Sequence, residues 1–327
     1  MDLQCLDEDV QFYFQQGLAP STRKTYRSGI AKFNNFCATY NVVDPLPASE
    51  SLVCYYITYL AKQKLTYQTI KTYLAALRYL HVANELPPPI RMIEMPKLKM
   101  LTRGIQRAQV KDSPPRPRLP ITPTILRQIR ALWSNHEHEF DYIMLWAAMC
   151  MAFFGFFRMG ELTIPSQTAF DSSVHLTFGD IAVDSMVNTQ SIRVTIKQSK
   201  TDQFRTGAQV FLGRTGDKML CPVAALLAYL AVRQGGDGPL FYYTDGTYLT
   251  KDNFIKPVRE ALNTLGYVSE KFAGHSFRIG AATTAAEAGI DEATIKAMGR
   301  WRSDAYQTYV RVPQERMWSI SKTLAKQ

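Results

Sequence analysis

The spacing of apolar residues changes along this 327-residue chain, and that change limits the folds open to it. From about residue 21 to residue 84, apolar side chains recur at steps of three and four, which is the period of an amphipathic helix. The first such run carries Tyr26, Ile30, Phe33 and Cys37. Two further runs with the same period follow Pro47, so the first part of the chain is expected to form an all-helical domain.

The second part of the chain mixes two periods. Three short segments, 175–183, 191–197 and 208–212, alternate apolar with polar residues and are rich in β-branched side chains, which is typical of strands. Helical patterns surround them, starting at Thr122 and Pro123 and resuming at 222–233 and 251–265. The predicted fold is therefore mainly α: a helical N-terminal domain, followed by an α+β domain with a small antiparallel sheet.

The longest apolar stretch covers residues 142–157 and contains no charged residue. A membrane-spanning helix needs roughly 20 such residues, and this run stops at Arg158, so we expect a buried core helix and no membrane partner. The five cysteines lack the paired spacing of a disulfide framework or a zinc site. The N-terminus lacks a basic region followed by an apolar run. An intracellular protein is therefore expected, nuclear if the host is a eukaryote.

A basic stretch over residues 96–118 separates the two patterns. Pro87 to Pro89 end the helical region, and the stretch that follows has Asp112 as its one acidic residue. Its basic residues are Lys97, Lys99, Arg103, Arg107, Lys111, Arg116 and Arg118. We expect a helical domain over 1–95, a basic linker over 96–118 and a second domain over 119–327. The linker is either a solvated tether or a strap along a phosphate backbone.

The net charge points to a polyanionic partner. The chain has 38 Lys and Arg against 28 Asp and Glu, a formal charge of +10, which favours nucleic acid or an anionic membrane surface. Polar and basic positions on the N-terminal helices and in the basic stretch are candidates for DNA contact. They are Arg23, Lys24, Arg27, Thr69, Lys71, Arg78, Lys97, Lys99 and Arg103. Solvated helix faces have the same composition, so this alternative stays open.

Two arginines and a histidine form the most informative chemical pattern. His275 and Arg278 are three residues apart, so on a helix they share one face. Arg158 offers a second guanidinium. A phosphodiester under attack gains negative charge on its non-bridging oxygens, and planar, permanently charged guanidinium groups suit that charge. We interpret the three side chains as a phosphate clamp; the alternative for Arg158 is an ordinary ion pair with Glu161.

The segment GHSFRIGAATTAAEAGIDEATIKAMGRWRSDAYQTYVR, residues 274–311, resembles the C-terminal catalytic box of the tyrosine recombinases, the phage-integrase family. The upstream FRMGELT resembles that family's first arginine box. The GRW…Y form is similar to recombinases of eukaryotic mobile elements, such as Cryptons and DIRS-like retrotransposons. This resemblance implies a SAM-like core-binding domain ahead of a catalytic domain. It also implies double-stranded DNA as substrate, a homotetramer with a dimer on each DNA site, and no cofactor.

The resemblance also implies a role for each matching residue. Tyr309 would attack the phosphate and form a 3′-phosphotyrosine, and Tyr306 is the alternative nucleophile. A free phenol has a pKa of about 10, so His275 or the arginines would ease its deprotonation. The other matches are Arg158 and Arg278 as the phosphate clamp, Trp301 as a hydrogen-bond donor to phosphate, Glu161 as the group that orients Arg158, and a loop lysine that protonates the leaving 5′ oxygen. Lys200 fits that lysine best, with Lys197 and Arg205 nearby.

Other chemistries fit the sequence less well. The HEHE run at 136–139 lacks further matched ligands, so no metal site is expected. No Gly-rich loop with GK[ST] is present, which argues against an NTPase. A catalytically silent DNA-binding protein and a type IB topoisomerase-like enzyme stay open as alternatives. After Pro313, a short tail places Met317, Ile320 and Leu324 on one helical face, for docking onto a neighbouring subunit or onto its own domain.

Overall fold

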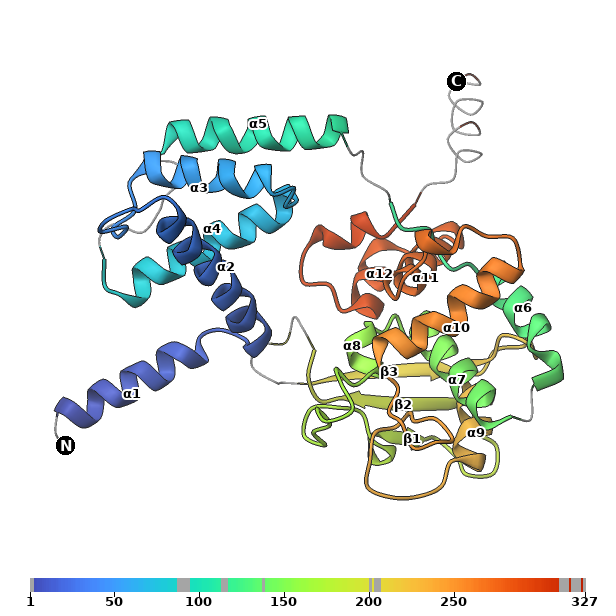
Figure 1. Ribbon diagram of the computed structural model, residues 1–327. Helices are drawn as coiled ribbons and strands as arrows, with labels where there is room; N and C mark the ends of the chain where they lie inside the picture. The colour runs from blue at the N-terminus through green and yellow to red at the C-terminus, as the bar shows by residue number, and fades with distance from the viewer. Residues whose placement is uncertain are drawn as a thin grey trace. The chain divides into compact units, whose positions relative to one another are not determined.

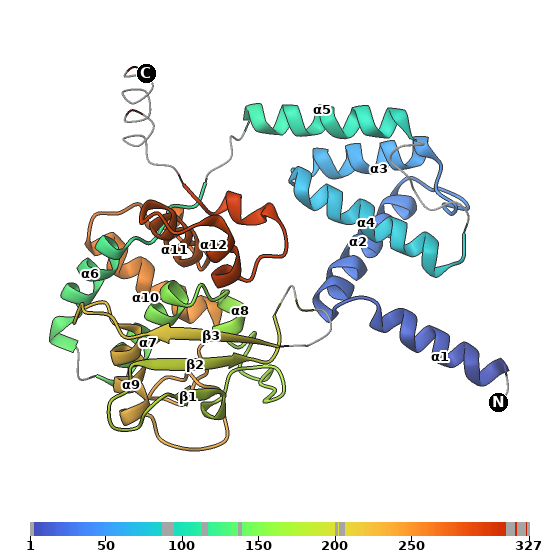
Figure 2. The same cartoon turned by 180° about the vertical axis from the view of Figure 1, so that it is seen from behind.

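The computed structural model describes residues 3–86, 95–112, 117–136, 139–199, 202, 207–311, 318 and 325. The chain divides into two compact units, Met1–Pro115 and Arg116–Gln327, which Figures 1 and 2 show from opposite sides. Each unit has a hydrophobic core of its own. None of the helices in the described ranges is long and apolar enough to cross a membrane.

The first unit is all helical, as its apolar period predicts. Its helices are α1 (Leu3–Gln16), α2 (Pro20–Thr39), α3 (Glu50–Lys62), α4 (Tyr67–Ala83) and α5 (Pro96–Asp112). The side chains of Ser49 and Thr66 cap α3 and α4 by accepting bonds from backbone N–H groups in the first turns. Phe33, Tyr56 and Leu77 lie in the core that α2, α3 and α4 share. This packing leaves the polar faces of α2 and α4 exposed.

Helix α5 covers most of the stretch that we expected to be a linker. It runs beside α3 in both views, and Leu98 on its inner face is fully buried in the first core. The side chain of Gln109 bonds to the backbone of Tyr67 and Leu65 at the start of α4. Residues 96–112 are therefore a packed helix, not an extended strap. The expected domain boundaries stay a prediction.

The second unit begins with helices and then forms the predicted sheet. Thr122 caps α6 (Pro123–Leu132), and α7 (Phe140–Phe154) and α8 (Met159–Leu162) follow. Strands β1 (Ile181–Val183), β2 (Ser191–Ile196) and β3 (Ala208–Gly213) form an antiparallel sheet in the order β1-β2-β3. Ile192 pairs with Val183 on one side and Leu212 on the other, so apolar side chains of neighbouring strands share the inner face.

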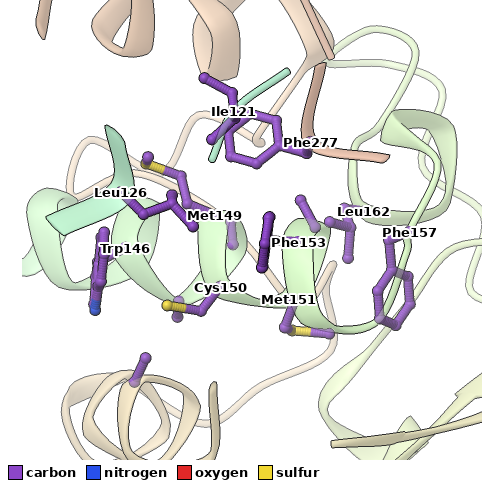
Figure 3. Close-up of a cluster of buried hydrophobic side chains, with 14 of the residues drawn as sticks. Ile121, Leu126, Trp146, Met149, Cys150, Met151, Phe153, Phe157, Leu162 and Phe277 are labelled. Atoms are coloured by element: carbon purple, nitrogen blue, oxygen red, sulfur yellow. The ribbon is translucent and has the colours of Figure 1, made fainter. Parts of the chain in front are cut away.

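The apolar run at 142–157 forms the buried centre of this unit. Every residue of α7 from Met144 to Phe153 is buried, and Figure 3 shows its side chains, among them Trp146, Met149 and Phe153, pointing in different directions around the helix. Helices α9 (Pro222–Val232) and α11 (His275–Glu287) pack against it. A helix surrounded by protein can be apolar on all sides, so the run is a core helix, as predicted.

The C-terminal part of the second unit is again helical. It contains α10 (Lys251–Thr264), α11, α12 (Glu292–Gly299) and a final 3-10 turn, η4 (Asp304–Thr308). Three other 3-10 turns lie at Ser134–His136, Phe178–Asp180 and Ser269–Lys271. The tail after Pro313, with Met317, Ile320 and Leu324, lies outside the described residues.

Candidate active site

Two short segments that are far apart in the sequence meet at the start of α8 and the start of α11. Arg158 is the N-cap residue of α8, and His275 is the first residue of α11. Gly274 makes the close approach possible, because a Cβ atom at this position would lie 2.0 Å from the side chain of Met159. The absence of a side chain on Gly274 therefore lets the first turn of α11 contact α8.

Arg158 is held by the carboxylate of Glu161. The Arg158 backbone N–H donates to Glu161 Oε2 at 2.9 Å, and its Nη1 donates to Glu161 Oε1 at 2.9 Å. The Glu161 side chain is buried, whereas part of the Arg158 side chain reaches the surface. The ordinary ion pair considered from the sequence is present, and it fixes the direction in which the guanidinium of Arg158 points.

Arg278 lies fully buried on the next turn of α11. Its Nη2 donates to the Gly299 carbonyl at 2.8 Å, and its Nη1 donates to the Phe156 carbonyl. The Trp301 and Tyr309 rings cover it, with their centroids 4.5 Å and 5.5 Å from the guanidinium carbon. Burial, followed by the positive charges of Arg158 and Arg300, lowers the pKa of Arg278 to about 10. Arg278 therefore stays charged at neutral pH.

Tyr309 lies among the groups that the resemblance assigns to the phosphate. Its ring centroid is 5.0 Å from that of Trp301 and 6.1 Å from that of His275. The tyrosine is half-buried and follows η4, and the hydroxyl of Thr283 on α11 donates to its backbone carbonyl at 3.2 Å. Arg158, His275, Arg278, Trp301 and Tyr309 thus form one cluster, in which Glu161 holds Arg158, Arg278 carries the two rings, and His275 lies beside Tyr309. We call it the cluster around Glu161.

The alternative nucleophile, Tyr306, occupies a different environment. It is buried at 3% exposure, and its hydroxyl donates to a carboxylate oxygen of Glu292. The Lys296 ammonium lies 5.4 Å from its ring. The hydrogen bond to Glu292 raises the pKa of Tyr306, so this phenol is harder to ionise.

The lysine expected to protonate the leaving group is Lys200, which lies outside the described residues, as does Arg205. The nearby Lys197 is described. Its Nζ forms an ion pair with Asp180 Oδ2 at 2.6 Å and donates to the Ser172 carbonyl at 2.8 Å. The Lys197 ammonium group is thus bound by groups of residues 172–180.

Sequence reasoning missed one arginine of this cluster. Arg300 Nη2 donates to Glu161 Oε2 at 2.8 Å, so a single carboxylate joins Arg158 and Arg300. Arg300 follows Gly299 at the end of α12 and precedes Trp301. In the sequence, Arg300 is marked only as the middle residue of the GRW pattern, in which we gave a role to the tryptophan alone.

The predicted DNA-binding residues lie on three helices of the first unit. Lys24 and Arg27 of α2, and Lys71 and Arg78 of α4, are exposed. Lys97, Lys99 and Arg103 of α5 are exposed too, whereas Arg23 and Thr69 are half-buried. The Thr69 hydroxyl shares a hydrogen bond with that of Thr66, 2.9 Å away, so it takes part in the cap of α4.

The HEHE run has a local explanation in its described part. His136 stacks on Tyr142 with ring centroids 4.5 Å apart, and its Nδ1 lies 2.7 Å from Glu139 Oε1. The two residues between them lie outside the described ranges. Among the residues that are described, no group of three His, Cys, Asp or Glu side chains is placed to hold a metal ion.

Comparisons with known proteins find similarity in both units. Residues 3–82 match the family model described as "Phage integrase, N-terminal SAM-like domain". An integrase/recombinase xerD homolog from Selenomonas ruminantium is 26% identical over 296 residues, which cover 89% of this chain and 81% of that protein. The sequence similarity therefore extends well beyond the N-terminal unit.

Solved structures share the fold. The XerH site-specific recombinase bound to a palindromic difH substrate in a post-cleavage complex matches with a TM-score of 0.61 and 15% identity, over 91% of this chain and 78% of that chain. The Tn1549 transposon integrase in complex with transposon right end DNA matches with a TM-score of 0.62 and 12% identity, over 97% and 98%. A lambda integrase dimer bound to a COC′ core site matches with a TM-score of 0.56 and 15% identity, over 94% and 76%. The expected fold class, a SAM-like helical domain followed by an α+β domain, is confirmed.

Proposed function

The chain is related in sequence and fold to the tyrosine recombinases, and we propose that it is a site-specific DNA recombinase that cleaves and rejoins DNA through Tyr309. The observation that carries this proposal is the cluster around Glu161, which gathers guanidinium groups beside a phenol. Arg158 and Arg278 supply these guanidinium groups, and both lie in segments that resemble the family's catalytic boxes. Double-stranded DNA is the substrate, and its phosphodiester is the anion that the positive charge of the cluster attracts.

The reaction is two successive transfers of one phosphoryl group. The Tyr309 oxygen attacks the phosphorus, and the bond from phosphorus to the 5′ oxygen breaks. The phosphate then links Tyr309 to the 3′ end of the cleaved strand. Lys200 gives a proton to the departing 5′ oxygen. In the second transfer a 5′-hydroxyl attacks the phosphotyrosine and releases Tyr309. The energy of the broken bond is kept in the phosphotyrosine, so no nucleotide cofactor is consumed.

Each side chain of the cluster has a separate role in this reaction. Arg158 and Arg278 neutralise the charge that develops on the non-bridging oxygens, and the Trp301 N–H donates to one of them. His275 takes the phenolic proton. Because the rings of Trp301 and Tyr309 cover Arg278 in the DNA-free structure, the incoming phosphate must displace at least one of them to reach its guanidinium.

The exposed basic residues of the first unit hold the DNA in this scheme. Lys24 and Arg27 of α2, Lys71 and Arg78 of α4, and the outer face of α5 contact the phosphate backbone. Four copies assemble on two sites, one dimer on each; the dimeric lambda integrase on a core site supports the lower step of this assembly. In a eukaryotic host this DNA lies in the nucleus.

The direct test is a covalent protein–DNA adduct. Nicked duplexes made from the sequences that flank the gene are mixed with the protein. A nick just downstream of the cleavage point lets the short fragment with the free 5′-hydroxyl diffuse away, which traps the phosphotyrosine. Wild-type protein and Tyr306→Phe are expected to give an SDS-resistant adduct, and Tyr309→Phe none. Tandem mass spectrometry of the adduct peptide Ser303–Arg311, which holds both tyrosines, locates the nucleotide. An adduct on Tyr306 would reverse the assignment, and tight DNA binding without any adduct would favour the silent DNA-binding protein.

A further inference from the structure

Arg300 has a backbone conformation that arginine seldom adopts. It ends α12 with φ of 54° and ψ of 44°, in the left-handed region. This conformation strains an ordinary residue, and glycine or asparagine usually takes such a position at a helix end. A glycine would therefore make this turn at lower cost. The side chain of Arg300 must give an advantage that offsets the strain.

The outer nitrogens of the Arg300 guanidinium donate to four groups: the Glu161 carboxylate in α8, two backbone carbonyls that precede α8, and the Met298 carbonyl of α12, which lies 3.3 Å from Nη1. Nη2 donates to Glu161 Oε2 at 2.8 Å and to the Phe156 carbonyl at 3.1 Å, and Nη1 donates to the Gly155 carbonyl at 3.1 Å. The remaining donor, Nε–H, is buried without a partner. Both outer nitrogens of Arg300 are therefore engaged by groups of the protein itself.

Two of these four acceptors also hold the arginines proposed to clamp the phosphate. The Glu161 carboxylate accepts from Arg158, and the Phe156 carbonyl accepts from Arg278. Phe156 itself has a positive φ of 50°, which turns its backbone away from the path of α7. Arg300 thus contacts both the carboxylate that holds Arg158 and the carbonyl that holds Arg278.

Charge alone does not explain this arrangement. Arg300 and Arg158 repel Arg278, since their positive charges contribute to the lowered pKa of Arg278. The contribution of Arg300 therefore lies in its geometry, because a planar fork can bind a carboxylate and a carbonyl at fixed angles whereas an ammonium group cannot hold both in one plane. We infer that Arg300 is a positioning residue that fixes Glu161 and the Phe156 carbonyl, and through them the guanidinium groups of Arg158 and Arg278. This inference rests on the proposed function.

The first test compares cleavage rates on the trapped DNA substrate at saturating protein. Arg300→Ala is expected to slow adduct formation by about tenfold to a hundredfold, the scale of a small misplacement of catalytic groups, while DNA affinity changes by less than about twofold. Arg300→Lys keeps the charge and is expected to restore only part of the rate. The control is Arg302→Ala, which removes the same charge from an exposed residue two positions away. Full activity of Arg300→Lys would overturn the inference, because charge would then suffice.

The second test asks whether Arg300 acts through Arg158. If Arg300 positions Arg158, Arg300→Ala should slow cleavage much less in a chain that already carries Arg158→Ala. The effects of the two substitutions on the logarithm of the cleavage rate will then not be additive. Additive losses would show that the two residues act independently and would contradict the positioning role.

The third test needs neither DNA nor activity. The side-chain Nε–H resonances of arginine are recorded by NMR in protein labelled with ¹⁵N-arginine, and Arg158→Lys and Arg278→Lys assign the two signals. Arg300→Ala should shift both signals, and Arg302→Ala should shift neither. If thermal melting shows that Arg300→Ala does not fold, Arg300→Lys takes its place. Unchanged signals would overturn the inference, whereas coupled signals in a protein that forms no adduct would refute the proposed function alone.

Discussion

Arg158 and Arg278 can lie in one buried cluster because a carboxylate and backbone carbonyls offset part of their charge. Glu161 accepts from Arg158 and Arg300, and the Phe156 and Gly299 carbonyls accept from Arg278. Three guanidinium groups against one carboxylate leave an excess of positive charge. Such an excess is costly in a buried site unless an anion completes it. The phosphodiester of the proposed substrate would bring that anion.

Lys200 carries the sharpest prediction at the scale of single residues. Lys200→Ala should slow cleavage by about a hundredfold or more, because the 5′ oxygen would leave without a general acid. A substrate with sulfur in place of that 5′ oxygen should restore the rate, since a thiol ionises near pH 8.5 and needs no proton to leave. The measurement is single-turnover adduct formation on the two substrates.

Lys197→Ala is the matched control for Lys200. Removing Lys197 leaves the buried Asp180 carboxylate without its ion-pair partner, so this variant should melt at a lower temperature. Sulfur in the substrate should give it no specific recovery. If the sulfur substrate rescued Lys197→Ala and not Lys200→Ala, the general acid would have to be reassigned to Lys197.

The sequence indicates which residues lie together in the proposed site better than it indicates the groups that hold them in place. His275 and Arg278 are recognisable because their spacing follows the helix period, and the structure places both on α11. Arg300 is not recognisable in this way, since its contacts depend on a left-handed backbone at the end of α12 and on the carbonyl of Phe156, 144 residues away. A local pattern does not contain such a contact.

Helix α5 packs on the first core, although its exposed face is rich in basic residues. Leu98 and Thr102 are buried on its inner face, whereas Lys99 and Arg103 are exposed. Leu101 and Ile105 pack against the same core, so the inner face does carry the apolar period of a helix. The seven basic residues of the stretch outweighed this period in our interpretation and suggested a linker, whereas apolar residues alone set the pattern of the strands and of α7.

The outer face of α5 gives a prediction at the scale of elements. Lys99 and Arg103 are four residues apart, so they share one face of the helix. If both contact phosphates, Lys99→Gln with Arg103→Gln should lower the slope of log K against log salt concentration by about 0.9 for each lost contact. Fluorescence anisotropy of a labelled duplex across a salt series measures that slope.

A charge-matched control separates this contact from net charge. Lys251→Gln with Lys256→Gln removes two exposed charges from α10 in the second unit and should leave the slope close to that of the wild-type protein. Equal slopes for the wild-type protein and the α5 variant would place α5 away from the DNA backbone.

At the scale of the whole molecule, the proposed function assigns DNA binding to the first unit and cleavage to the second. Phe33 and Leu77 belong to one core and Met149 and Phe277 to the other, so each unit buries enough apolar surface to fold by itself. The sequence predicted this division because the apolar period changes between the two parts. Helix α5 packs on the first unit although its composition is that of a linker, and the expected boundaries at residues 95 and 118 stay a prediction.

This division predicts how the two units behave when they are separated. The fragment 116–327 carries every residue of the cluster around Glu161, so it should still form the Tyr309 adduct on a nicked duplex. It should need a protein concentration about a hundredfold higher or more, because tethering the DNA-binding unit raises the effective concentration of the cluster at the DNA. The fragment 1–115 should bind DNA with a steep salt dependence and form no adduct. Tyr309→Phe in the larger fragment is the control. A folded fragment 116–327 that cleaves at no concentration would mean that the first unit contributes a group to the chemistry, and the separation of DNA binding from cleavage would be wrong.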